Sequence, residues 1–434
     1  MALPATSPRR TGRTRRLTGA ISAAAALSLT LSACAGSAGS GGGAGAGGGG
    51  EGYEAGADQA AIDEALADLD PVTIIYQPSA ASQESVQSPS GTVLAEAIEE
   101  RSGGKITVDM VWGQAIAPYG ELDSALADGR VDLAYSLPVY KPAEYPALNA
   151  LGDALGGSDP SPFVGEMVTN AMALDVAWNT PEIVAEYEEK GLTPISPITA
   201  SGGYYSVCSA TGMTQEDFQG RQVRIASKTQ GELISHMGAS PVSMEYTETY
   251  EALQRGTVDC TLGQLVPSAE AGIFEVAPNV GYMTETSFSR APGALVAGSG
   301  FAELPLAYQQ VIFDSYADYF QGQMMTTIGG NADGIRQAKE AGGEIEQFPE
   351  EFQTEIAAFN EENLAKINES GPIEGDLEAA VTAASEKWTA KAAELGYEDG
   401  GTTADMDQWY DVDSDFRPLG QAIYDEVLLP HRPS

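Results

Sequence analysis

Hydrophobic and polar positions form blocks that predict a strand–helix–strand order in the first part of the chain. VTIIY (72–76) is a compact β-branched run, and apolar residues at helical spacing (93–98) follow it. ITVDMVW (106–112) and VDLAYSL (131–137) predict two further strands, and glycines end the helices between them. Such alternation indicates a parallel sheet with helices on its faces.

A second unit of the same kind begins near residue 191. It combines strand-like runs with a helix over 231–238 and a helix–glycine–strand pattern over 249–263. The patterns towards the C-terminus predict mainly helix, including a segment that is helical throughout 350–396. The chain therefore predicts an α/β protein with two lobes.

The N-terminal residues have the pattern of an export signal. Five arginines and no acidic residue precede an apolar run (17–30) that is short for a membrane span. Leu31-Ser32-Ala33-Cys34 resembles a bacterial lipobox, and a Gly/Ala/Ser tract (35–52) follows it. We therefore expect a lipoprotein signal peptide (1–33), a tether (34–54) and lipidation of Cys34, which would anchor the protein at the extracytoplasmic face of the membrane. An ordinary secretory signal is the alternative.

The charge balance excludes nucleic acid as a partner. The formal net charge is −40, and without residues 1–33 the chain keeps 17 Lys and Arg against 62 Asp and Glu. Phosphate binding needs a basic face, which this composition does not supply. Roughly 370 residues follow the tether, enough for two domains.

Apart from Cys34, the cysteines are Cys208 and Cys260. In an oxidising compartment they favour a disulfide, with two buried thiols as the alternative. Only His236 and His431 are available as histidine ligands, so we expect no metal and no cofactor. The acidic run DVDSD (411–415) lacks the glycine and glutamate of a calcium loop and is typical of a solvated turn.

Three consecutive stretches carry a resemblance to a known family. GRQVRIASK (220–228), MGASPVSMEYTETYEALQRGTVDC (237–260) and IFEVAPNVGYMTETSF (273–288) resemble the solute-binding proteins of tripartite ATP-independent periplasmic (TRAP) transporters. The positions that match the family pattern are Gly220, Val223, Arg224, Gly238, Ala239, Pro241, Met244, Tyr246, Glu248, Tyr250, Ala252, Leu253, Gln254, Gly256, Val258, Asp259, Phe274, Glu275 and Val276.

This resemblance implies a two-lobed binding-protein fold with strands crossing between the lobes and a long C-terminal helix. We assign 70–202 and 286–330 to one lobe, and 203–285 and 331–430 to the other with the C-terminal helices. The resemblance also implies a monomeric receptor, without enzymatic activity, that captures a small organic acid between the lobes. It would deliver this acid to the membrane subunits of a TRAP permease.

Arg224 is the residue that the resemblance assigns to the ligand carboxylate. A planar guanidinium matches two carboxylate oxygens, and a closed cleft shields the pair from water. A structural ion pair is the alternative role, and Arg221 and Lys228 are expected to be surface charges. The chain departs from the family at Gly263, where an asparagine often stands, and Gln264 is the nearest amide.

Other candidate ligand contacts lie near the ends of predicted strands, where open α/β sheets bind ligands. Tyr246 occupies an aromatic position of the family pattern, and Arg290 could supply a second cation. Trp112, Tyr119, Tyr140 and Trp178 are more typical of core or surface positions. The remaining candidates are Tyr76, Gln77, Ser136, Tyr204 and Tyr205.

Other functions have less support. A catalytic site would need a nucleophile or base in a recognisable arrangement, and no such motif is present, so a secreted hydrolase is disfavoured. A ligand sensor or the binding protein of an ATP-driven importer would share the fold and stays open as an alternative. An aromatic-rich cleft with few cations favours a monocarboxylate with an apolar or hydroxylated body.

Overall fold

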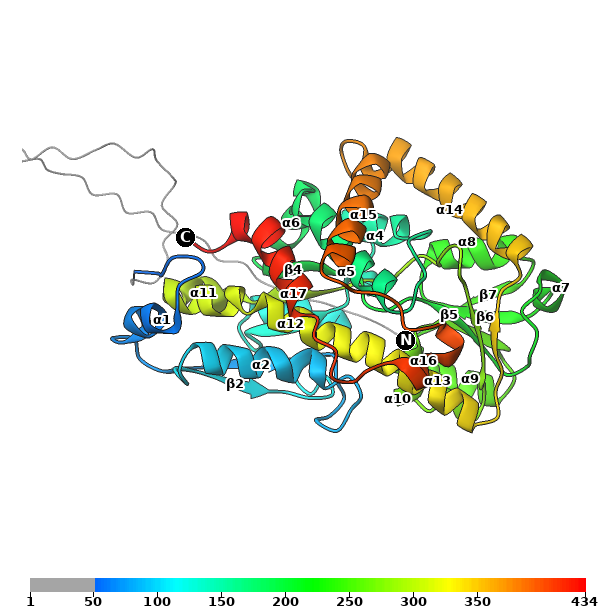
Figure 1. The fold of residues 1–434 in the computed structure, drawn as a ribbon, viewed down its shortest axis with the longest axis horizontal. Helices are drawn as coiled ribbons and strands as arrows, with labels where there is room; N and C mark the ends of the chain where they lie inside the picture. Colours follow the sequence, from blue (N-terminus) through cyan, green and yellow to red (C-terminus); the bar gives the residue numbers. More distant parts are fainter. Residues whose placement is uncertain (1–50) are drawn as a thin grey trace, which may run out of the picture. The chain divides into compact units, whose positions relative to one another are not determined.

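The computed structural model describes residues 51–434. The predicted signal peptide, Cys34 and nearly all of the predicted tether lie outside these residues. The described chain builds two mixed sheets, each with helices packed around it (Figure 1). This arrangement confirms the two-lobed α/β fold.

The first lobe contains a five-stranded sheet in the order β2-β1-β3-β10-β4. β1 is parallel to β2 and β3, whereas β10 is antiparallel to β3 and β4. The strands are β1 (Val72–Gln77), β2 (Ile106–Met110), β3 (Leu133–Ser136), β4 (Thr193–Thr199) and β10 (Gly293–Ala297). The accompanying helices are α1 (Gln59–Leu66), α2 (Pro89–Arg101), α3 (Leu122–Ala127), α4 (Pro146–Ala154), α5 (Val164–Trp178), α6 (Pro181–Glu188) and α11 (Leu306–Asp314).

The second lobe contains a six-stranded sheet in the order β11-β9-β5-β8-β6-β7. β6 is parallel to β7 and β8, and β5 is antiparallel to β8 and β9. The strands are β5 (Tyr205–Cys208), β6 (Gln222–Ile225), β7 (Ser240–Ser243), β8 (Cys260–Gly263), β9 (Asn279–Tyr282) and β11 (Ile345–Gln347). Its helices are α7 (Gln215–Phe218), α8 (Lys228–His236), α9 (Thr249–Gln254) and α10 (Leu265–Glu270).

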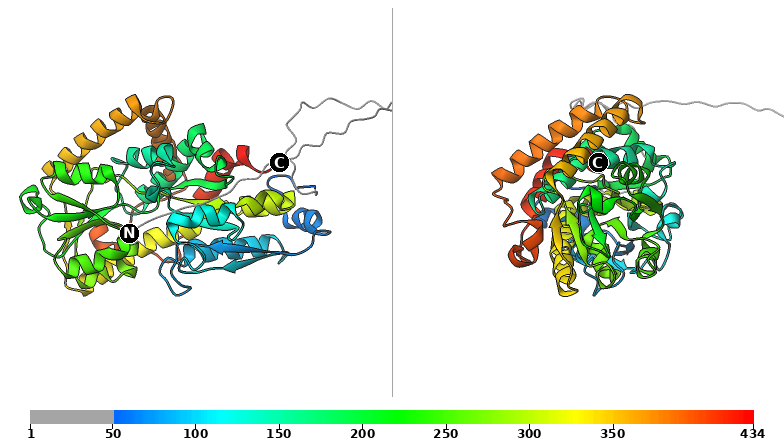
Figure 2. Two further views of the ribbon diagram at one scale, coloured as in Figure 1. Left: turned by 180° about the vertical axis from the view of Figure 1, so that it is seen from behind. Right: turned by 90° about the vertical axis from the view of Figure 1, so that its right-hand side faces the viewer.

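Three connections join the lobes between β4 and α13 (Gly330–Glu340). Residues 200–204 lead from β4 to β5, and residues 283–292 lead back from β9 to β10. We call these the outward and return crossing segments. The third connection is helical: α12 (Tyr316–Met324) packs on α2, a π-helical turn (Met325–Gly329) follows, and α13 packs on α10 (Figures 1 and 2).

Gly322 allows α12 to lie close to α2. A Cβ at this position would overlap the carbonyl oxygen of Pro89. We expect Gly322→Ala to lower the free energy of unfolding, because overpacking costs about 1–3 kcal/mol and exceeds the roughly 0.5–1 kcal/mol that alanine gains over glycine in a helix. Urea unfolding would measure this. Gly231→Ala in α8, where a Cβ would make ordinary contacts of 3.6 Å or more, is the matched control and should not destabilise.

The C-terminal helices differ from the expected assignment. We placed 331–430 with the second lobe, but α15 (Leu377–Glu394) packs on α5 and α17 (Arg417–Ile423) on α12. Trp388 of α15 is fully buried in the first-lobe core, and its indole nitrogen donates to Asp175 Oδ2 at 2.9 Å. Burial of this large aromatic side chain against α5 holds the C-terminal region on the first lobe.

The helix expected over 350–396 is interrupted. α14 (Glu350–Ser370) ends before Gly371 and Pro372, and α15 begins at Leu377. Proline disfavours the helical conformation in the residue before it, which accounts for the break. α14 starts on the second-lobe core, and Asn360 near its middle donates to Ser287 of the return crossing segment at 2.8 Å. A short helix, α16 (Met406–Trp409), follows α15.

The first and last described residues meet at one end of the first lobe. Arg432 forms an ion pair with Asp314 at 2.8 Å and donates to the carbonyl oxygen of Tyr53 at 2.9 Å. Gln310 accepts a hydrogen bond from Tyr53 N and donates one to Pro433 O. The side chains of Arg432 and Asp314 are only 9% and 8% exposed, so this terminal clasp belongs to the packed structure.

Asp153 contacts the second lobe, and its protonation makes the stability of the protein depend on pH. Thr229 Oγ1 of α8 donates to Asp153 Oδ2 of α4 at 2.8 Å. Burial raises the pKa of Asp153 to about 6, and the Thr229 hydrogen bond and Lys228 partly oppose this effect, while Glu232 adds to it. The folded chain therefore binds this proton more tightly than the unfolded chain does.

Binding of this proton stabilises the folded chain fully below about pH 4, and this stabilisation is lost as the pH rises through about 6. We expect Asp153→Asn to raise the free energy of unfolding above pH 6 by about 2–3 kcal/mol, and to have no such effect at pH 4. Melting temperatures of both proteins between pH 4 and pH 8 would test this. A difference that does not change with pH would contradict the assignment.

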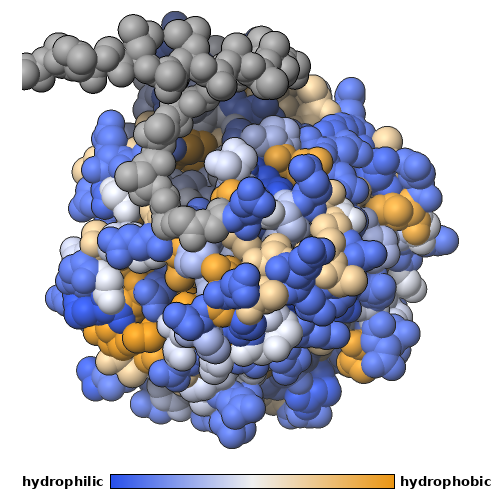
Figure 3. All heavy atoms as spheres, turned by 90° about the vertical axis from the view of Figure 1, so that its left-hand side faces the viewer, coloured by the Kyte–Doolittle hydropathy of each residue, from blue (hydrophilic) through white to orange (hydrophobic). Residues whose placement is uncertain are grey.

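Hydrophilic residues cover most of the face in Figure 3, with hydrophobic residues in small groups between them. Within residues 51–434, no helix has the length and apolar character needed to cross a membrane.

Candidate functional site

A cavity of about 620 Å³ lies where loops of the two lobes face each other. First-lobe loops after β1, β2 and β3 supply one wall, and second-lobe loops after β6, β7 and β8 supply the opposite one. These are carboxyl ends of parallel strands, where open α/β sheets bind ligands. The outward crossing segment and the π-helical turn after α12 complete the lining.

Arg224 is the only lysine or arginine among the described residues that line this cavity. It lies on β6 and is 2% exposed. Its Nε donates to the carbonyl oxygen of Met244 at 3.1 Å, and its guanidinium lies over the ring of Tyr246, 5.0 Å from the centroid. It pairs with no carboxylate of residues 51–434, and its two terminal nitrogens donate to none of these residues. The two terminal nitrogens of the guanidinium, with four N–H groups, thus remain for a ligand.

Five tyrosines line the cavity. The Tyr246 hydroxyl is 2.6 Å from Ser268 Oγ and the Tyr135 hydroxyl is 2.7 Å from Ser201 Oγ, so both rings are held in place. Burial raises the pKa of each of these two phenols to about 12, which keeps them neutral at ordinary pH. The complete set is Tyr119, Tyr135, Tyr140, Tyr204 and Tyr246.

Two carboxylates also line the cavity. Glu270 of α10 accepts hydrogen bonds from Ser85 and Gln87, which lie in the first-lobe loop after β1. Glu245 follows β7, and its side chain is exposed. The cavity therefore combines one cation, two anions and many aromatic and uncharged polar groups.

Five of the predicted site residues line the cavity: Arg224, Tyr246, Gly263, Gln264 and Tyr204. Gln264 Nε2 donates to Gly202 O at 2.9 Å and so joins the second lobe to the outward crossing segment. A Cβ at Gly263 would lie 3.4 Å from the Tyr246 ring. The side chain that the family often has at this position would therefore lie against that ring.

Five other predicted residues do not line the cavity, and their assignment to its wall is corrected here. Tyr76 and Tyr205 are buried in the lobe cores, because strands covered on both faces turn many side chains inwards. The amide of Gln77 bonds to the backbone of Ile116 and Ala117. Ser136 donates to Asp123 Oδ1.

Arg290 is the fifth of these residues. Its guanidinium forms a buried ion pair with Glu166 at 2.6 Å, and the side chains are 1% and 3% exposed. It is therefore occupied within the protein and does not supply the second cation that we considered.

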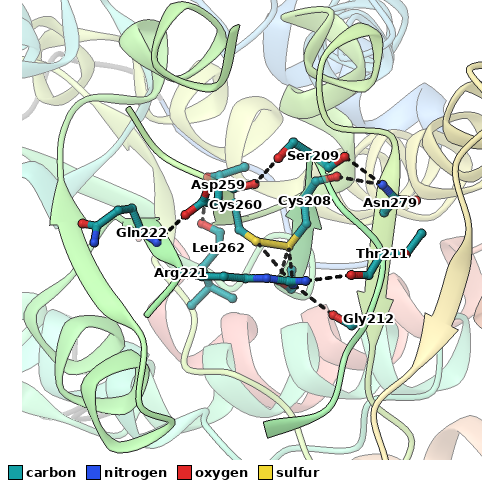
Figure 4. Close-up of a disulfide and its surroundings, with 12 residues drawn as sticks. Cys208, Ser209, Thr211, Gly212, Arg221, Gln222, Asp259, Cys260, Leu262 and Asn279 are labelled. Carbon is teal, nitrogen blue, oxygen red and sulfur yellow. Dashed lines mark hydrogen bonds between the residues drawn. A yellow bond between two sulfur atoms is a disulfide. The ribbon is translucent and has the colours of Figure 1, made fainter. Parts of the chain in front are cut away.

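Cys208 and Cys260 are directly opposite each other on β5 and β8 and form a disulfide with an S–S distance of 2.08 Å (Figure 4). Arg221, expected at the surface, lies half-buried beside it. Its guanidinium donates to the carbonyl oxygens of Thr211 and Gly212 at 2.7 and 2.9 Å, and Nη1 is 3.7 Å from Cys208 Sγ. Lys228 is exposed and pairs with Glu232.

Sequence reasoning missed much of the lining. Tyr135 lies next to the candidate Ser136, and Tyr119 and Tyr140 were assigned to core or surface positions. The ring centroids of Tyr119 and Tyr140 lie 6.3 Å apart. Trp178, by contrast, stacks on His431 away from the cavity. The available signal was that these tyrosines lie within or after the predicted strands 106–112 and 131–137.

The described part of the chain contains no cluster of side chains that could hold a metal ion. No group of three or more His, Cys, Asp or Glu residues there is arranged to hold an ion, including the acidic run 411–415.

Comparison with known proteins identifies the family. Residues 79–370 match the model of bacterial extracellular solute-binding protein, family 7, whose members are solute-binding proteins and not enzymes. A protein described as a solute-binding protein from Albidiferax ferrireducens is 26% identical over 208 residues. The match covers 44% of this chain and 58% of that relative.

Solved structures with the same fold include a marine metagenome TRAP solute-binding protein specific for aromatic acids, in complex with 3-hydroxybenzoate. It has a TM-score of 0.63 and 16% identity, over 74% of this chain and 99% of that one. A Rhodoferax ferrireducens TRAP protein with copurified benzoate has a TM-score of 0.62 and 16% identity, over 75% and 100% of the chains. A sugar-acid-binding protein from Advenella mimigardefordensis in complex with galactonate has a TM-score of 0.57 and 21% identity. The match covers 76% of this chain and 100% of that one. With the match to more than half of its length, this chain belongs to the bacterial extracellular solute-binding proteins of family 7.

Proposed function

We propose that this protein is an extracytoplasmic receptor that binds a small organic monocarboxylate between its lobes and delivers it to a TRAP permease. The observation that carries this proposal is the guanidinium of Arg224. It is buried and lies over the ring of Tyr246. Its two terminal nitrogens donate no hydrogen bond to any of residues 51–434. Such a fork matches a carboxylate in both shape and charge.

The other charges of the cavity favour a single carboxylate on the ligand. Glu245 and Glu270 line the cavity, and no cation other than Arg224 does so in the described chain. A second carboxylate would meet these like charges inside the cavity, and like charges repel. The ligand body would instead meet tyrosine rings and uncharged amides and hydroxyls.

The size of the cavity agrees with an aromatic or hydroxylated ligand body. Its volume of about 620 Å³ lies within the range of roughly 300–1,000 Å³ that is common for small-molecule sites. Structures with the same fold hold 3-hydroxybenzoate, benzoate and galactonate, which have one carboxylate, and another holds succinate, which has two. These ligands support a small organic acid, and the preference for one carboxylate rests on the charges that line the cavity.

The partners that we propose follow from the role as a receptor for a TRAP permease. TRAP membrane subunits would receive the ligand, and the receptor would act as a monomer. A lipid on Cys34, outside the described residues, would hold it at the membrane. Mass spectrometry of the exported protein, with Cys34→Ser as the control, would test the anchor, since only a lipidated cysteine adds the mass of acyl chains.

The proposal is tested by thermal denaturation of residues 53–434 with a panel of acids. The panel contains benzoate, 3-hydroxybenzoate, galactonate and succinate, with glucose and alanine as controls. A monocarboxylate at 100 times its dissociation constant should stabilise the protein by about 2.7 kcal/mol. Succinate should give a smaller shift. Stabilisation by glucose alone, or by succinate above all monocarboxylates, would contradict the proposed class.

A further inference from the structure

A buried ion pair lies where both crossing segments pass the first lobe. Glu166 of α5 accepts a hydrogen bond from Gly203 N at 2.8 Å with one oxygen and from Arg290 Nη1 at 2.6 Å with the other. Gly203 belongs to the outward crossing segment and Arg290 to the return segment. One carboxylate of the first lobe therefore contacts both crossing segments.

The same pair fixes an unusual backbone conformation beside the cavity. Ser201 has a φ of 58°, which side-chain-bearing residues seldom adopt. Its carbonyl oxygen accepts from Arg290 Nη1 at 2.8 Å and from Asn170 Nδ2 at 3.0 Å. Its hydroxyl lies 2.7 Å from that of Tyr135. Ser201, Tyr135 and Ala291, the neighbour of Arg290, all line the cavity.

A second set of contacts connects the pair to the strand that bears Arg224. The carbonyl oxygen of Ser289, the residue before Arg290, accepts from Gln230 Nε2 at 3.3 Å. Gln230 is fully buried, and its Oε1 accepts from Ala226 N at 3.0 Å. Ala226 lies two residues after Arg224. A chain of contacts thus runs from Glu166 in the first lobe to the end of β6 in the second.

We infer that Glu166 and Arg290 are positioning residues for ligand binding. The pair sets the placement of the outward crossing segment on one side of the cavity and of Arg224 on the other. The pair does not line the cavity, and it acts through Ser201 and Gln230. As far as affinity is concerned, this inference rests on the proposed function. The coupling between the two ends of the chain of contacts can be measured without any ligand.

The test uses Glu166→Gln/Arg290→Met, which removes both charges together. A single substitution would leave an unpaired buried charge and could prevent folding, whereas joint removal of a buried pair is often tolerated. The glutamine keeps an acceptor for Gly203 N. Asp314→Asn/Arg432→Met is the matched control, because it removes a buried pair at the terminal clasp, away from both crossing segments.

Two measurements are made on these proteins and the wild type. Hydrogen exchange without ligand is followed in peptides that cover 199–205 and 224–230. Binding of 3-hydroxybenzoate, and of the strongest acid from the panel, is followed by calorimetry. In the Glu166→Gln/Arg290→Met protein we expect faster exchange in both peptides and an affinity at least tenfold weaker. The control should match the wild type in both measurements.

The outcomes separate this inference from the proposed function. Faster exchange confined to 199–205, with unchanged affinity, would overturn the inference and leave the pair a purely structural contact. Unchanged exchange in both peptides would overturn it as well. If the wild type binds no acid, the proposed function fails. Exchange in 224–230 then still decides whether the pair positions β6.

Discussion

Arg224→Ala is expected to weaken monocarboxylate binding by about two to four orders of magnitude. The substitution would leave the ligand carboxylate with no cation among the described lining residues, in a cavity that Glu245 and Glu270 also line. Loss of one partner of a buried ion pair costs about 3–5 kcal/mol, which corresponds to this loss of affinity. Calorimetric titration with 3-hydroxybenzoate or the strongest acid of the panel would measure it.

The folding of this variant should be little affected. Arg224 has no carboxylate partner among residues 51–434, so its removal leaves no buried anion behind. Arg224→Lys is the informative companion, because lysine keeps the charge and loses the planar fork. We expect its affinity to lie between those of the wild type and Arg224→Ala. Equal binding by all three proteins would contradict the role given to Arg224.

The Cys208→Ser/Cys260→Ser protein is expected to lose about 4 kcal/mol of stability. The disulfide closes a chain segment with a sequence separation of 52 residues, and the chain-entropy relation gives a destabilisation of this size for such a loop. The melting temperature should fall by roughly 5 °C, because an entropy of unfolding of about 2.1 cal/mol/K per residue gives about 0.8 kcal/mol/K for residues 51–434. Differential scanning calorimetry of the two proteins would measure the change.

Reductant provides the control for this prediction. The wild type in excess dithiothreitol should approach the melting temperature of the double variant, which itself should not respond to reductant. The disulfide joins β5 to β8, and β8 pairs with the strand that bears Arg224. The folded double variant should nevertheless still bind its ligand, because the ladder between β8 and β6 does not depend on the sulfur atoms. A melting temperature equal to that of the wild type would contradict the stabilising role.

Both lobes could be predicted from the sequence, because β1, β2 and β3 lie in short runs rich in apolar residues and the family pattern covers most of the second lobe. The family pattern placed Arg224 on β6 and Tyr246 after β7, and both line the cavity. The tyrosine next to Ser136 shows where such prediction fails. All four residues of β3 are buried, so the strand shows no alternation that would tell which side chains face the cavity.

The same reason explains Tyr205, which faces the second-lobe core while its neighbour Tyr204 lines the cavity. The role of Arg290 could not be read from the chain, because its partner Glu166 is 124 residues away and lies within a helix that is buried on almost every face. Ion pairs between residues so far apart in the sequence depend on how the lobes pack, and local sequence patterns do not reveal them.

The terminal clasp has a mechanical consequence. Arg432, Asp314, Gln310 and Tyr53 fasten the first described residues to the last at one end of the first lobe. Force applied through either end of this part of the chain would enter the molecule there and would not pass through the crossing segments. A protein fixed to a sensor surface or fused to a fluorophore at these ends would thus keep its second lobe outside the path of the applied force.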